Sequence, residues 1–92
     1  MNKAAIATGL NAIANSSTTL VAYSDLIAIM NTGEGPANMV RALFEDCSLA
    51  TLEAIADSIG MTSNNLETAY LNAKNSHGAV NPELDLRIKE PF

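Results

Sequence analysis

The sequence predicts an all-α fold, a small single-domain bundle of about five short helices that occupies residues 1–92. Apolar residues recur every three or four positions in successive segments, which is the spacing of one helix face. Breaks rich in Gly, Pro, Ser, Thr and Asn separate these segments. Nearly half of the residues (48%) are apolar, and many of them are Ala, the residue with the highest helix propensity.

The first half of the chain predicts three helices. They are expected over about residues 2–15, 19–31 and 36–47. The second is apolar around most of its circumference, which indicates burial on several sides, and it could also begin late with Ser24 as its N-cap. Cys47 continues the apolar stripe of the third helix, so we expect a buried and unreactive thiol.

The clearest stretch, residues 49–75, predicts a tight hairpin of two helices. Gly60 is expected to end the first helix, because glycine tolerates the left-handed conformation of a C-terminal cap. Thr62 or Ser63 is a suitable N-cap for the second helix. The two apolar stripes consist of Leu49, Leu52, Ile55, Ala56 and Ile59, and of Leu66, Ala69, Tyr70 and Ala73.

Residues 52–71 also carry the pattern of a helix-turn-helix. A small residue, Ala56, stands where the two helices would cross, and Gly60 follows four residues later in the turn. The apolar positions are Ile55, Ile59, Met61, Leu66 and Ala69. In this pattern the segment resembles the DNA-binding helix-turn-helix and is most similar to the first such unit of AraC-type regulators. The resemblance covers about a fifth of the chain, and any tight αα-hairpin needs similar residues.

This resemblance implies a set of candidate DNA contacts at the start of the second hairpin helix. They are Thr62, Ser63, Asn64, Glu67 and Thr68, with Lys74 on a phosphate. The charge opposes this function, because the chain has ten acids, five bases and a formal net charge of −5. Between Ser48 and Ser76 one Lys stands against three acids. DNA binding is therefore the alternative hypothesis.

The tail, residues 79–92, has two readings. Leu84, Leu86 and Ile88 alternate with charged residues as in a strand, whereas Asn81-Pro82-Glu83 is a good helix start. We expect an extended arm that lies on its own domain or on a neighbour, so that removing residues 81–92 lowers the oligomeric mass without unfolding the helices. The candidate protein-interface residues are Leu71, Leu84, Leu86, Ile88 and Phe92.

Composition favours a protein-binding role over catalysis. Only 16% of the residues are charged, which lowers the cost of burying the surface against another chain. One His and one Cys provide no readable catalytic or metal-binding set, and no cofactor, signal peptide or membrane span is indicated. We therefore expect no enzyme, but an oligomeric structural or protein-interaction component.

In composition, though by no motif, the chain resembles small phage structural or accessory proteins. Such a component would be cytoplasmic or assembled into a particle, with copies of itself or another protein as partner. A small acidic inhibitor of a host protein is the third hypothesis, because the net charge is negative.

Overall fold

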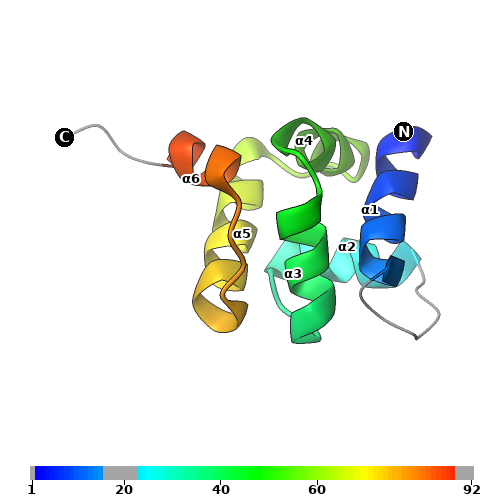
Figure 1. The fold of residues 1–92 in the computed structure, drawn as a ribbon. Coiled ribbons are helices and arrows are strands. Elements are labelled where there is room, and N and C mark those ends of the chain that lie inside the picture. The colour runs from blue at the N-terminus through cyan, green and yellow to red at the C-terminus, as the bar shows by residue number, and fades with distance from the viewer. Residues whose placement is uncertain (1, 16–22, 89–92) are drawn as a thin grey trace.

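The computed structural model describes residues 2–15 and 23–88, and in these ranges the chain folds into helices joined by short connections (Figure 1). The elements are α1 (Lys3–Asn15), α2 (Tyr23–Thr32), α3 (Ala37–Asp46), α4 (Leu49–Ser58), α5 (Ser63–His77) and α6 (Pro82–Ile88). The all-α prediction is confirmed, and within the described ranges the helices number six. Residues 19–22 of the predicted second helix lie outside the described residues. Ser24 is inside α2 and is not its N-cap.

The tail is where the structure differs from the sequence expectation. Residues 82–88 form α6 rather than an extended arm or a strand. A helix places Leu84 and Ile88 on one inward face at i, i+4 spacing, whereas Leu86 points outward. The Asn81-Pro82-Glu83 helix start therefore prevails over the alternating pattern, and residues 89–92 lie outside the described part.

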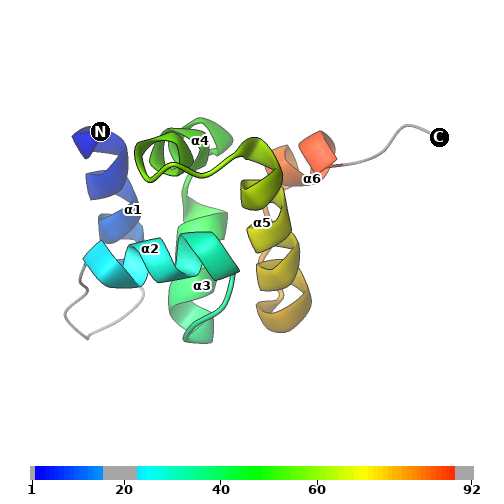
Figure 2. The same ribbon diagram turned by 180° about the vertical axis from the view of Figure 1, so that it is seen from behind.

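The helices surround one apolar core. α1, α3 and α5 stand side by side with α3 in the middle, α2 crosses them on one face, and α4 lies across one end (Figures 1 and 2). α1 packs against α3 and α4, whereas α5 packs against α2, α3 and α4. The largest fully buried side chains are Tyr70, Phe44, Ile13, Leu26, Met30, Leu43, Leu52, Ile55, Leu66, Leu84, Val40 and Cys47.

The loop between α2 and α3 lies directly against α5. Gly33 has a φ of 68°, and a Cβ at this position would collide with the carbonyl group of Ala69. Beside it, the Asn72 side-chain amide donates a hydrogen bond to the Thr32 carbonyl at 3.1 Å. Glycine is therefore required here both for the backbone conformation and for the close approach of two elements.

Candidate functional site

The turn between α4 and α5 follows from its capping residues. The Ser48 hydroxyl accepts a hydrogen bond from the Thr51 amide at 3.1 Å and begins α4. Gly60 has a φ of 79°, and the amide of Met61 donates to the Ala56 carbonyl at 2.8 Å, as in a Schellman motif. Thr62 begins α5 by accepting a hydrogen bond from the Asn65 amide at 3.2 Å. The glycine turn is confirmed, and Thr62 rather than Ser63 is the cap.

A half-open hollow of about 230 Å³ lies beside this turn. It is lined by Glu53, Ala56, Asp57, Met61, Ser63 and Leu66, so α4, the turn and the first residues of α5 all contribute. Ligand pockets for drug-sized molecules begin at about 300 Å³ and are deeper. The hollow is therefore large enough for a single side chain rather than for a cofactor.

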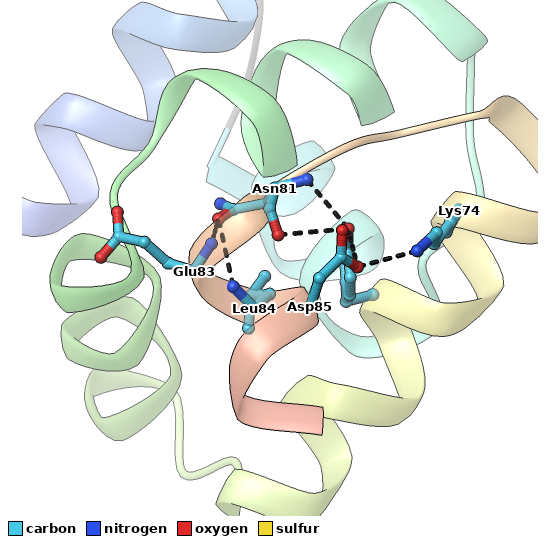
Figure 3. A network of polar contacts seen from close by, with 6 residues as sticks. Lys74, Asn81, Glu83, Leu84 and Asp85 are labelled. Atoms are coloured by element: carbon cyan, nitrogen blue, oxygen red, sulfur yellow. Dashed lines mark hydrogen bonds and ion pairs between the residues drawn. The ribbon is translucent and has the colours of Figure 1, made fainter. Parts of the chain in front are cut away.

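A buried polar network around Asn81 connects the start of α6 to the end of α3 and to α5 (Figure 3). Asn81 is only 3% exposed, and its side-chain amide donates to the carbonyls of Phe44 and Cys47 at 2.8 and 3.1 Å. Its side-chain oxygen accepts from the amides of Glu83 and Leu84 at 3.1 and 3.2 Å. One side chain thus satisfies carbonyls at the end of α3 and amides at the start of α6, groups that a helix leaves unpaired.

The network continues from Asn81 to α5 through Tyr70. The Tyr70 hydroxyl accepts a hydrogen bond from the Asn81 backbone amide at 2.9 Å and donates one to Asp85 at 2.8 Å. Lys74 donates to the same Asp85 oxygen at 2.8 Å, as Figure 3 shows. Lys74 first and Tyr70 second lower the pKa of Asp85, whereas burial raises the pKa of the Tyr70 hydroxyl. The donors and acceptors of this network pair with one another. The network therefore holds α6 in place against α5.

Three of the cationic side chains pair with carboxylates of this same chain. Arg41 contacts Glu45 at 2.8 Å, and Lys74 contacts Asp85. Arg87 of α6 contacts Glu53 of α4 and lies 3.6 Å from Glu67 of α5. These contacts neutralise charges that a nucleic-acid site would direct at phosphates.

The predicted DNA-contact residues are only partly brought together. Ser63, Asn64 and Thr68 are exposed on the first half of α5, where the Thr68 hydroxyl donates to the Asn64 carbonyl at 3.0 Å. Thr62 caps the helix, and Glu67 lies near Arg87. Lys74 lies farther along α5 and binds Asp85.

The predicted interface residues are also divided by the structure. Leu71 and Leu86 are exposed by 40% and 74%. Leu84 is fully buried within its own chain, so it is not a surface residue, and Ile88 packs partly buried against the core. Phe92 lies outside the described residues. The reason is the helical period. Leu84, Leu86 and Ile88 would share one face of a strand, but in a helix Leu86 points away from the other two.

Sequence reasoning missed the role of Asn81 and the hollow beside Gly60. The pattern Asn-Pro-Glu did signal a helix N-cap at Asn81. Nothing in the sequence indicated that the same side chain would also reach carbonyls 34 and 37 positions earlier. The hollow depends on the angle between two helices, which periodicity alone does not specify.

Comparisons with known proteins leave the function to be argued from geometry. No protein-family model, curated protein or solved structure matches this chain. In the described ranges, no His, Cys, Asp or Glu side chains gather in a group of three that could hold a metal ion. None of the helices that the structure describes has the length and apolar character needed to cross a bilayer.

Proposed function

We propose that this chain is a non-enzymatic component that assembles with copies of itself through an apolar contact on α6. The observation that supports it is the exposure of Leu86, which is 74% exposed. Leu86 lies on a helix whose first turn is held in place by Leu84 and Asn81. Burying a leucine side chain contributes about 1.5–3 kcal/mol, so an exposed one is a strong source of binding free energy.

Rigid presentation makes Leu86 a better contact than a leucine on a loose tail. A contact on a preorganised element loses less conformational entropy when it binds. Leu84 is fully buried two residues earlier, and Arg87 next to Leu86 pairs with Glu53. Leu86 is therefore exposed on a helix that other contacts already hold against the core.

The DNA-binding alternative is less well supported than assembly. Phosphate contacts need several free Lys or Arg side chains. Here Lys74 and Arg87, the described cations of α5 and α6, already bind carboxylates. The net charge of −5 adds long-range repulsion. That charge is what favours the remaining alternative, an acidic inhibitor, but Leu86 plays no part in that hypothesis.

The deciding experiment is the absolute mass in solution, from light scattering after size exclusion at low and high salt. We expect a multiple of the 9.7 kDa chain mass that salt does not reduce, because apolar contacts are not screened. Leu86→Ser should shift the mass towards the monomer.

Tyr23→Ser is the matched control for this measurement. It also removes a half-exposed apolar side chain, but at the start of α2, on the α1 side of the molecule and away from α6 (Figure 2). A wild-type chain that is monomeric at every concentration overturns the proposal, and so does a Leu86→Ser variant of unchanged mass.

A further inference from the structure

We propose that the hollow beside the α4–α5 turn receives a Lys or Arg side chain from a different, basic protein. The inference rests on the proposed function only in that the ligand is a protein, and it concerns a second surface. The hollow is lined by residues of α4, the turn and α5, whereas Leu86 belongs to α6.

The lining has the two kinds of surface that a long cationic side chain needs. Met61 is partly exposed and provides apolar contact for an alkyl stem, above the buried Ala56 and Leu66. Glu53 and Asp57 provide carboxylates for the charged head. Lys and Arg bury their stems against apolar surface while the charged group stays at the edge. The volume of about 230 Å³ suits one such side chain.

The electrostatics of the hollow favour a cation and disfavour a phosphate. Asp57 lies in the last turn of α4, where the helix dipole adds partial negative charge. In the part of the chain that the structure describes, no hydrogen bond or ion pair engages the Asp57 carboxylate. This carboxylate is therefore free for a partner.

The chain's own Arg87 already uses the neighbouring carboxylates in this way. Its guanidinium contacts Glu53, a lining residue, and lies 3.6 Å from Glu67. The three carboxylates of Glu53, Glu67 and Asp57 outnumber the single arginine, Arg87. This surface therefore keeps a net negative charge. A second cation would complete the pairing at Asp57.

The occupant is a different protein rather than a second copy of this chain. A second copy would bring a further net charge of −5, and three of its described cations, Arg41, Lys74 and Arg87, would be paired already, which leaves Lys3 at the start of α1. A segment that carries Lys or Arg beside an apolar residue complements both the carboxylates and the apolar lining of the hollow. Charge complementarity therefore selects the class of partner.

The test is a titration of the full chain, followed by its backbone amide chemical shifts. The probe is the peptide acetyl-Leu-Lys-Leu-amide, and the control probe replaces its lysine by the uncharged norleucine. We expect the lysine peptide to shift the amides of residues 53–66, with weaker binding at high salt. Asp57→Asn should weaken this binding about three- to fivefold, as the loss of an exposed ion pair does.

Asp46→Asn is the matched variant, because it removes the same charge from an exposed position on α3. We expect it to leave the affinity unchanged. Equal binding of the norleucine peptide, or equal losses in the two variants, overturns the proposal, since either would mean binding without the Asp57 pair. If Asp57→Asn abolishes self-association, a second copy of this chain is the occupant of the hollow. That result also overturns the proposal.

These outcomes separate the two proposals. An oligomer that binds neither peptide overturns the cation site alone, whereas a monomer that binds the lysine peptide overturns self-assembly alone.

Discussion

At the scale of single residues, Asn81 connects three helices. Its side chain bonds the end of α3 and the start of α6, and its backbone amide bonds Tyr70 of α5. Buried polar groups lose free energy when a partner is removed, because water cannot replace it. The end of α3 and the start of α6 therefore depend on one amide side chain, and the backbone of the same residue adds the bond to α5.

Replacing Asn81 by Ala should destabilise the domain by about 2–4 kcal/mol, because carbonyls and amides around it would lose their partners. The measurement is urea unfolding followed by circular dichroism, with the midpoint compared at equal slope. Asn64→Ala is the control, since Asn64 is exposed on α5 and its loss should change stability by less than about 0.5 kcal/mol. Equal midpoints for the two variants would contradict the structural role of Asn81.

At the scale of elements, α6 is part of the core rather than an addition to it. Leu84 contributes a fully buried side chain, and Asp85 connects α6 to Tyr70 and Lys74. A short helix of this kind has little stability alone, so tertiary contacts maintain it. The same contacts stabilise the ends of α3 and α5 in return.

Truncation should therefore unfold the domain instead of only reducing its mass, which changes the expectation from the sequence. A chain of residues 1–80 lacks Asn81 and Leu84, so we expect loss of cooperative thermal unfolding in circular dichroism. A chain of residues 1–88 keeps both and serves as the control, with a cooperative transition. A cooperative transition of the shorter chain near that of the control would show that α6 is dispensable.

At the scale of the whole molecule, local patterns predicted the helices and long-range contacts decided the rest. Gly60 and Thr62 specify the α4–α5 turn through bonds to near neighbours, so the sequence sufficed there. The burial of Leu84 and the pairing of Arg87 with Glu53 join residues far apart in the chain. Their geometry depends on how helices cross, and a repeat of apolar residues does not determine this.

Cys47 can report the opening of the whole domain. The predicted burial is confirmed at 2% exposure, and burial, with the nearby Asp46 charge, raises the pKa of the thiol to about 11. We expect no reaction with a disulfide reagent near pH 8 until the domain unfolds, with full reaction in denaturant as the control. Labelling of the native chain at the rate of the unfolded one would contradict this.

The position of Asn81 also has a consequence for synthesis. The ribosome makes α1 to α5 before Asn81. The carbonyls of Phe44 and Cys47 therefore lack their hydrogen-bond donor until Asn81, 37 and 34 residues later, has been added. Domains tend to fold as units while the chain emerges. A nascent chain that stops short of Asn81 thus exposes the end of α3 and the apolar surface that Leu84 covers, and this exposed surface makes it prone to aggregation.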